Sequence, residues 1–290
     1  MNSAKGEFKN IKMEIRALKQ ALKKNKILDA TSRILAYPMF KSQYVKSDNE
    51  AKKRKEGRID PDYIWIQGLK DKYLGERCFV VATGPSLTLE DLYLIRNEYS
   101  FGMNSGLLIF NRSPWRPNFF AIQDEYVFAD LKDQLDAVSS DDLKEIWVSD
   151  SLASHYSMSS RYHVFPLHYL DHKMYHRNGY GEFRFSDDCY SCIYDAYSVT
   201  FSILQFACYM GFRKIYLLGC DCNYNQAKTH FVEYGHRDPK AKIMGSKMIA
   251  GHVEFKKFAD EKNIHVVNCT RGGMLEVYPR ENLETVLSRR

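Results

Sequence analysis

Short apolar runs alternate with amphipathic segments along most of the chain. The apolar runs, bounded by small or polar residues, predict strands, and apolar positions at helical spacing between them predict helices. We expect strands at 79–82, 100–103, 118–122, 145–148, 162–165, 214–219 and 264–267, and helices at 63–73, 89–96, 126–135, 195–210 and 247–262. This alternation predicts an α/β fold, a Rossmann-like and mostly parallel sheet with helices on both faces.

The first predicted strand ends at a turn of Thr83, Gly84, Pro85 and Ser86, and Thr88 then predicts the N-cap of a helix. A strand, a glycine turn and a helix N-terminus commonly cradle a phosphate, because backbone N–H groups are free there and the helix dipole favours an anion. Neither the Walker pattern nor G-x-G-x-x-G is present, which excludes a standard ATPase or dinucleotide fingerprint. A purely structural turn is the alternative interpretation.

Polar side chains also follow other predicted strands. Asn104, Asp124, Asp221 and Asn268 each come just after a strand. In open α/β sheets, ligands bind outside the carboxyl ends of the strands. Each of these residues alone is a common turn former, but together with the first turn they predict a nucleotide cleft at this edge.

The composition is that of a globular protein. The 290 residues are 44% hydrophobic and include 20 Tyr and 17 Phe, which suits a sizeable core and argues against disorder. No apolar run approaches the ~20 residues that a membrane span needs, and the start of the chain lacks the apolar segment of a signal peptide. We therefore expect a cytoplasmic protein whose seven cysteines are reduced.

Positive charge is concentrated in the N-terminal part. Residues 1–58 contain 16 Lys/Arg and 6 Asp/Glu, a net charge of +10, whereas the whole chain carries +6. An apolar stripe at helical spacing accompanies this charge, formed by Ile11, Ile15, Leu18 and Leu22. We expect residues 1–75 to form a basic helical arm and residues 76–290 a Rossmann-like catalytic domain that binds a nucleotide or nucleotide-sugar. The arm is suited to an anionic membrane surface, or alternatively to docking on a partner subunit. We expect no nucleic-acid partner, because the remaining chain lacks a basic surface.

Several blocks resemble a known family. The Thr83–Leu87 turn looks like the Gly-x-Gly-Pro-Ser-Leu start of the bacterial family 42 sialyltransferases, and Met103-Asn104 resembles their second-strand Cys-Asn. A second similar block ends at Asp221: this chain has Gly-Phe-Arg-Lys-Ile-Tyr-Leu-Leu-Gly-x-Asp where those enzymes have Gly-Tyr-Lys-Glu-Ile-Tyr-Leu-x-Gly-x-Asp. A third block lies where they carry Tyr-x-Gly-His, and here it is Ile249-Ala-Gly-His252.

Two further blocks look more like a sister group. They are Asn268–Arg280 and Lys228-Thr-His-Phe231. This group contains the archaeal 6-hydroxymethylpterin pyrophosphokinase and the central domain of motility-associated factors. The combined resemblance covers about residues 77–287 and leaves the arm unexplained.

The resemblance implies a role for individual residues. His252 would be the general base that takes the proton from the acceptor hydroxyl, with His230 as the competing base, and an imidazole pKa near 6.5 suits that task. Tyr224 would supply the hydroxyl that stabilises the departing phosphate, although the family tyrosine corresponds to Asn223. The nucleotide-binding set would be Thr83, Gly84, Pro85, Ser86, Asn104, Asp124, Thr200, Gly219, Asp221 and Asn223.

The resemblance implies an inverting glycosyltransferase of the sialyltransferase type that needs no metal and no cofactor. Its donor would be a nucleotide-sugar, a CMP-linked nonulosonic acid, and its acceptor a bacterial surface glycan or a lipid-linked precursor. It would lie in the cytoplasm or peripherally on the inner face of the cell membrane, and a homo-oligomer is left open.

Two alternative functions belong to other classes. One is a pterin pyrophosphokinase-like phosphotransferase with Mg²⁺ held by Asp124 and Asp221. The other is a non-catalytic nucleotide-sugar-binding protein of a polysaccharide assembly complex. A zinc site at Cys189-x-x-Cys192 or Cys220-x-Cys222 is disfavoured because no histidine pair has finger spacing, and a hydrolase because no Gly-x-Ser-x-Gly elbow is present.

Overall fold

The structure is a computed structural model that describes residues 26–169, 183–224, 228–235 and 241–289. Contacts divide the chain into two compact units, Met1–Asp48 and Asn49–Arg290, and the boundary falls inside helix α2 (Lys26–Lys55). Residues 49–75 therefore belong to the larger unit. The division at residue 75, between a basic arm and a catalytic domain, concerns function and stays a prediction. The apolar stripe predicted between residues 11 and 22 lies outside the described residues.

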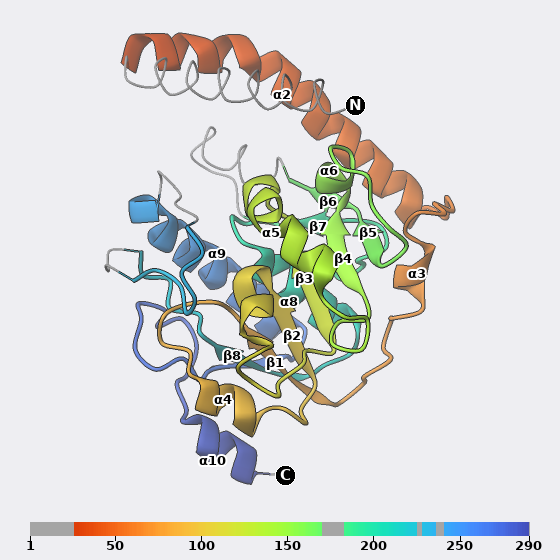
Figure 1. The fold of residues 1–290 in the computed structure, drawn as a ribbon. Helices are drawn as coiled ribbons and strands as arrows, with labels where there is room; N and C mark the ends of the chain where they lie inside the picture. The colour runs from red at the N-terminus through yellow and green to blue at the C-terminus, as the bar shows by residue number, and fades with distance from the viewer. Residues whose placement is uncertain (1–25, 170–182, 225–227, 236–240, 290) are drawn as a thin grey trace. The chain divides into compact units, whose positions relative to one another are not determined.

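A seven-stranded parallel sheet forms the centre of the larger unit, in the order β5-β4-β3-β2-β1-β8-β9 (Figure 1). The strands are β1 (Arg77–Val81), β2 (Ser100–Met103), β3 (Phe119–Ile122), β4 (Ile146–Ser149), β5 (Tyr162–Phe165), β8 (Lys214–Leu218) and β9 (His265–Asn268). The predicted α/β class and its parallel sheet are confirmed. The chain adds strands outward from β1 to β5 and then returns to place β8 and β9 on the other side of β1. The topological switch point therefore lies between β1 and β8.

Helices fill the connections between the strands. They are α3 (Ile64–Gln67), α4 (Leu89–Leu94), the 3-10 helix η1 (Asn104–Ile109), α5 (Glu125–Ala137), α6 (Asp150–Ala153), α8 (Val199–Tyr209), α9 (Ala241–Glu261) and α10 (Leu283–Ser288). A small parallel sheet joins β6 (Leu167–His168) to β7 (Ile193–Tyr194). Sequence patterns missed η1, α6, α10 and this small sheet, because each is too short to show a hydrophobic period.

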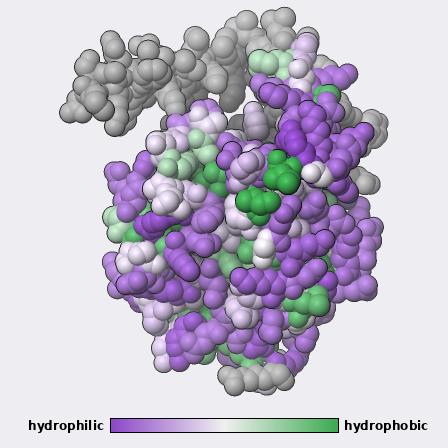
Figure 2. All heavy atoms as spheres, turned by 90° about the vertical axis from the view of Figure 1, so that its right-hand side faces the viewer, coloured by the Kyte–Doolittle hydropathy of each residue, from purple (hydrophilic) through white to green (hydrophobic). Residues whose placement is uncertain are grey.

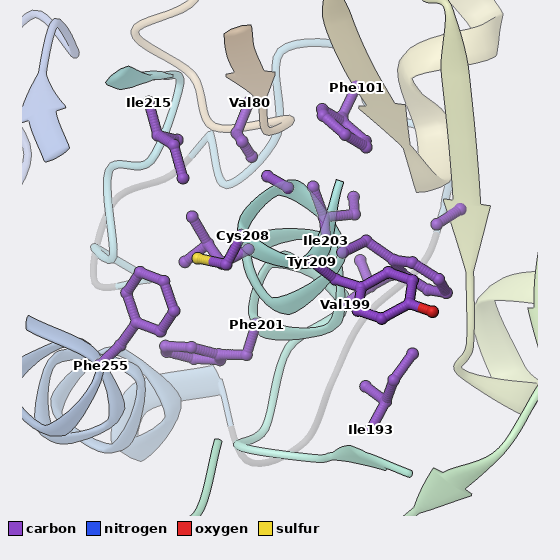
Figure 3. Packing of buried hydrophobic residues seen from close by; sticks show 14 of the residues in the cluster. Val80, Phe101, Ile193, Val199, Phe201, Ile203, Cys208, Tyr209, Ile215 and Phe255 are labelled. Atoms are coloured by element: carbon purple, nitrogen blue, oxygen red, sulfur yellow. The ribbon is translucent and has the colours of Figure 1, made fainter. Parts of the chain in front are cut away.

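Both faces of the large sheet are buried, so successive residues of a strand enter two different cores. Along β1, Val80 faces the core that contains α8 and α9, and Phe79 faces the core that contains α4, α5 and η1. Every residue of α8 is buried. Figure 3 shows this helix surrounded by side chains from the sheet, including Val80 and Phe101, and by Phe255 from α9. Burial of such a side chain contributes about 1.5–3 kcal/mol, which fixes α8 against the sheet.

One face of the molecule can be judged for its polarity, and its described residues are mainly polar there (Figure 2). The face seen in Figure 2 is mostly hydrophilic, and its hydrophobic side chains form small separate groups. Within the described ranges, no helix combines the length and the apolar character needed to cross a bilayer.

Candidate functional site

The two turns that follow β1 and β8 run side by side at the switch point. The ladder between these strands continues past their ends, since the Ala82 N–H donates to the Leu218 carbonyl and the Gly84 N–H to the Gly219 carbonyl, both at 2.9 Å. Gly219 has a φ of +64°, and a Cβ there would lie 2.7 Å from the Ala82 carbonyl oxygen. Glycine at this position therefore allows the chain after β8 to bend toward the first turn.

Asp221 fills the space that this bend creates beside the first turn. Its Oδ2 accepts hydrogen bonds from the Ser86 hydroxyl at 2.7 Å and from the Ser86 N–H at 3.4 Å. A Cβ on Gly84 would lie 2.0 Å from the same oxygen, so only glycine leaves room for the carboxylate. On the other side, the Met274 N–H donates to the Asp221 carbonyl at 2.7 Å. The residue is 7% exposed, and burial raises the pKa of its carboxyl group.

These contacts occupy the backbone donors from Gly84 to Leu87. Between Gly84 and Leu87 each N–H has an acceptor among the described residues, because the Leu87 N–H donates to the Gly84 carbonyl at 3.3 Å and Pro85 has no N–H. The free N–H groups predicted for a phosphate are therefore not found between Gly84 and Leu87, whereas phosphate binding at this turn stays a prediction. The predicted N-cap is confirmed, since Thr88 accepts from the N–H of Asp91 in a capping box.

The end of β2 brings further polar groups to the same edge. Asn104 has a left-handed φ of +48°, and its Oδ1 is buried without a hydrogen-bond partner in the described part of the chain. The Ser105 hydroxyl, in a residue that is 2% exposed, also lacks a partner among these residues. The Thr200 hydroxyl donates to the sulfur of Met103 at 3.5 Å, which joins the start of α8 to the end of β2. Buried polar groups of this kind are uncommon in folded proteins and indicate a site for a ligand or water.

A segment that we call the strap, residues 228–235, is anchored at the first turn. The Phe231 N–H donates to the Thr83 carbonyl at 2.7 Å, and Phe231 lines a small cavity together with Thr83 and Ser105. The Glu233 carboxylate accepts from the N–H groups of Thr229 and His230 at 2.9 and 3.1 Å. The strap therefore holds His230 next to the switch point, half-buried and at the edge of the sheet.

His252 lies in a different environment. It is 2% exposed on α9, where its Nδ1 lies 3.0 Å from the Tyr278 hydroxyl and its ring centroid 4.7 Å from that of Phe201. A Cβ on the preceding Gly251 would lie 2.7 Å from the Phe201 ring, so the helix packs closely here. Burial lowers the pKa of His252 to about 3, which leaves the ring neutral and a weak base. Its role as general base stays a prediction.

Some of the remaining predicted residues lie at the carboxyl edge of the sheet, and others hold helices or loops in place. Asp124 caps α5, since its Oδ1 accepts from the N–H groups of Tyr126 and Val127 at 2.8 and 3.0 Å. Asn223 and Tyr224 are half-buried just past β8. The Asn268 side chain donates to the Leu275 carbonyl and accepts from the Thr270 N–H, which fixes the loop after β9.

The structure thus brings together the residues 83–86, Gly219 and Asp221, with Asn104 just after the adjacent strand β2 and His230 on the strap. Sequence reasoning missed Gln123, which accepts from the Ser202 hydroxyl at 2.6 Å and donates to Asp195 at 3.1 Å. Gln123 directly follows a predicted strand, and that signal would have found it. It also missed Ser105 and Phe231, whose sequence context shows nothing unusual.

The predicted metal alternative and the cysteines can also be placed. The cysteine pairs 189/192 and 220/222 are buried and form no disulfide among the described residues. Within the described ranges, no three His, Cys, Asp or Glu side chains are grouped so that they could hold a metal ion.

Three non-glycine residues with a left-handed backbone gather at the carboxyl edge of the sheet. Asn104 follows β2, Cys222 follows β8, and Tyr197 precedes the N-cap of α8, with φ values of +48°, +50° and +72°. Such conformations cost about 1–3 kcal/mol each and concentrate at functional sites. The strain therefore marks the same edge as the polar cluster.

Comparison with known proteins adds a distant likeness. No protein-family model and no curated protein matches the chain. Among solved structures, the chain is similar to a MAf glycosyltransferase from Magnetospirillum magneticum AMB-1, with 13% sequence identity and a TM-score of 0.40. The match covers 77% of this chain and 38% of that protein, so the chain spans well under half of its length. That protein belongs to the motility-associated-factor side of the sequence resemblance, and no comparison confirms the family 42 sialyltransferases.

Proposed function

We propose that this protein is a glycosyltransferase whose nucleotide-sugar donor binds at the switch point between β1 and β8. The observation that carries the proposal is the meeting of Gly84, Ser86 and Asp221 at this point, from two strands that are distant in sequence. The crevice at the switch point of an open parallel sheet is the common ligand site of such folds. The strained residues and the unpaired Asn104 oxygen at the same edge support the location.

For the chemical step we assign the general base to His230. In an inverting transfer, the acceptor oxygen forms a bond to the anomeric carbon, and the bond from that carbon to the phosphate oxygen breaks. The acceptor proton passes to the imidazole, and the nucleotide leaves with the bonding electrons. His230 lies on the strap beside the switch point, whereas His252 is enclosed between α8 and α9. A base must come within hydrogen-bond reach of the proton that it removes, which favours His230.

The donor, the acceptor and the absence of a metal requirement follow from the sequence resemblance. On that basis the donor is a CMP-linked nonulosonic acid, and the acceptor is a glycan or lipid-linked precursor at the inner face of a bacterial membrane. On the same basis, Tyr224, which is half-buried just past β8, would donate its hydroxyl to the departing phosphate.

A thermal-shift screen tests this function. The full chain is heated with CMP, UDP, GDP or ATP, each with EDTA and with Mg²⁺. A nucleotide at 100 times its dissociation constant stabilises the fold by ~2.7 kcal/mol. We expect stabilisation by CMP in EDTA, and its loss in Gly84→Ala, because the added methyl displaces Asp221.

The other outcomes separate the alternatives. Stabilisation by ATP that requires Mg²⁺ would favour a phosphotransferase. Stabilisation by a nucleotide-sugar that is never consumed would indicate a binding protein, and no stabilisation by any nucleotide would contradict the proposal.

A further inference from the structure

We propose that the turn at Gly84–Ser86 receives the ribose hydroxyls of the nucleotide through Asp221, and that it excludes phosphate. This inference rests on the proposed nucleotide site and specifies which end of the nucleotide enters the switch point. A phosphate presents only acceptors at neutral pH, whereas a ribose presents a pair of neighbouring hydroxyl donors.

The first reason is that the turn has no donors left to offer. Phosphate sites on glycine turns depend on backbone N–H groups that point at the ligand. Here the Gly84 N–H is bonded to the Gly219 carbonyl, and the Ser86 N–H and hydroxyl face the Asp221 carboxylate. The helix that follows, α4, has only six residues, and the Thr88 side chain accepts from the N–H of Asp91 in its first turn. An incoming phosphate would therefore have to displace internal bonds.

The second reason is that two side-chain oxygens beside the first turn, which accept no hydrogen bond from another described residue, can only accept one. Asp221 uses Oδ2 to accept from Ser86, and its Oδ1 accepts no bond from any other described residue. On the opposite side of the first turn, the Asn104 Oδ1 is buried without a donor among the described residues. Each oxygen is satisfied by a ligand hydroxyl and not by a phosphate oxygen.

The third reason is charge. In the part of the chain that the structure describes, no lysine, arginine or histidine forms an ion pair with Asp221, and the attraction from Arg280 acts without a direct contact. Placing a phosphate at the turn would bring two like charges together, which is strongly unfavourable. A hydroxyl pair meets no such repulsion and gains charge-assisted hydrogen bonds.

The fourth reason is that Asp221 cannot easily move out of the way. Its backbone carbonyl accepts from Met274, and its side chain is held by Ser86. A Cβ on Gly273 would lie 2.7 Å from the Asp221 Cα, so the loop after β9 closes on it from behind. Main chain and side chain are thus fixed from two sides, and the carboxylate is a permanent part of the site.

The test uses Asp221→Asn, which keeps the size of the side chain and an acceptor for the Ser86 hydroxyl but removes the charge. Isothermal titration on the full chain measures three ligands: inorganic pyrophosphate, CMP and 2′,3′-dideoxy-CMP. Asp133→Asn is the control, because it removes the same charge from an exposed position on α5. Circular dichroism and the melting temperature establish that both variants fold.

We expect the wild type to bind 2′,3′-dideoxy-CMP about tenfold more weakly than CMP, and Asp221→Asn to reduce that ratio to about threefold or less. We also expect Asp221→Asn, and not Asp133→Asn, to bind pyrophosphate about tenfold more tightly than the wild type. Equal binding of the two nucleotides by the wild type, or unchanged pyrophosphate affinity in Asp221→Asn, would overturn the inference. If the wild type binds neither CMP nor another nucleotide of the screen, the proposed function fails, and the pyrophosphate comparison still tests the role of the Asp221 charge.

Discussion

Two histidines illustrate how the surroundings of a single residue decide what it can do. His252 follows a glycine in a block that resembles a catalytic signature, yet its ring packs against Phe201 and Tyr278. His230 lies in a polar stretch with little sequence pattern, yet the strap brings it to the switch point. Desolvation makes the first ring a weak base, whereas the second ring belongs to a half-buried residue on the strap.

The buried imidazole of His252 should make the fold sensitive to acid. Its folded pKa of about 3 lies below the unfolded value of about 6.5, so the unfolded state binds more protons below pH 6.5 and stability falls as the pH decreases toward 3. Between pH 7 and pH 5 this costs about 2 kcal/mol of the free energy of unfolding. Urea unfolding of the wild type and of His252→Gln at both pH values measures the difference. Parallel pH dependence in the two proteins would show that His252 does not titrate in this way.

The assignment of the base predicts opposite results for the two histidines. His230→Ala should lower kcat by roughly 10²-fold or more while nucleotide affinity stays near the wild-type value, as expected for a general base. His252→Gln should change kcat by less than about threefold, since the ring does not reach the edge. Steady-state kinetics with the donor found in the nucleotide screen measures both. A large loss of kcat in His252→Gln with little loss in His230→Ala would instead identify His252 as the general base.

At the residue scale, the sequence correctly indicated that the polar residues lie at the carboxyl edge of the sheet, but it did not indicate the hydrogen bonds that they form. That Asp221 and the first turn lie together follows from strand ends and parallel pairing alone. The hydrogen bonds from the Gly84 and Ser86 N–H groups to the residues after β8 could not be predicted, because these partners are about 135 residues away and depend on the bend at Gly219. Gln123 and Asp124 show the same limit: both follow β3, but one faces α8 and the other caps α5.

At the scale of elements, strands were easier to predict than connections. The buried runs of the parallel sheet are continuously apolar, so every predicted strand was found within two residues of its position. The start of α8 was wrong by four residues, because Ser198 caps the helix and the polar residues before it bond elsewhere. The predicted helix at 63–73 is helical only over α3, since the rest forms turns that bond to the end of α8.

The anchoring of the strap predicts a local change when Phe231 is replaced. Phe231→Ala removes a ring that packs against the core and lines the small cavity beside Thr83, so the strap should open more often while the sheet remains intact. Hydrogen exchange followed by mass spectrometry should show residues 228–235 exchanging about tenfold faster or more, with β1 and β8 unchanged. Tyr93→Ala is the control, because it removes an exposed ring from α4. Unchanged exchange in the strap would contradict this anchoring.

At the scale of the whole molecule, the boundary between the units changes how the basic segment is divided. Arg54 lies in the basic part of the sequence, but its side chain is 8% exposed and its Nε donates to the Ser191 carbonyl at 2.8 Å. It also forms an ion pair with Asp60 at 3.5 Å and lies over the Tyr63 ring. The charged cluster at 51–57 therefore contributes to the larger unit, and the composition gave no sign of this. Residues 1–48 keep 11 Lys/Arg and 4 Asp/Glu, a net charge of +7.

This division predicts different results for two truncations. Deletion of residues 1–48 should change the melting temperature by less than about 2 °C, whereas deletion of residues 1–58 should lower it by ~3 °C or more, because Arg54 and its contacts are lost. Differential scanning fluorimetry measures both. Equal melting temperatures would show that residues 49–58 do not stabilise the larger unit.

The same pair of proteins tests the proposed membrane contact of the arm. The full chain should bind anionic liposomes in a salt-sensitive manner, and the protein lacking residues 1–48 should not, while it still binds nucleotide. Sedimentation with vesicles of increasing phosphatidylserine content, at about 0.05 and 0.5 M salt, measures this. Equal binding by the truncated protein would contradict a membrane role and favour docking on a partner subunit.

The position of β1 at the centre of the sheet has a consequence for synthesis. Its neighbour β2 is made soon after it, but β8 begins about 130 residues later. At a translation rate of 5–20 residues per second, one edge of β1 waits on the order of ten seconds for its partner. During that time the growing chain presents an unpaired apolar edge that can pair with another chain. A ribosome that stops before residue 221 therefore releases a product that is prone to aggregate and has no switch-point site at all.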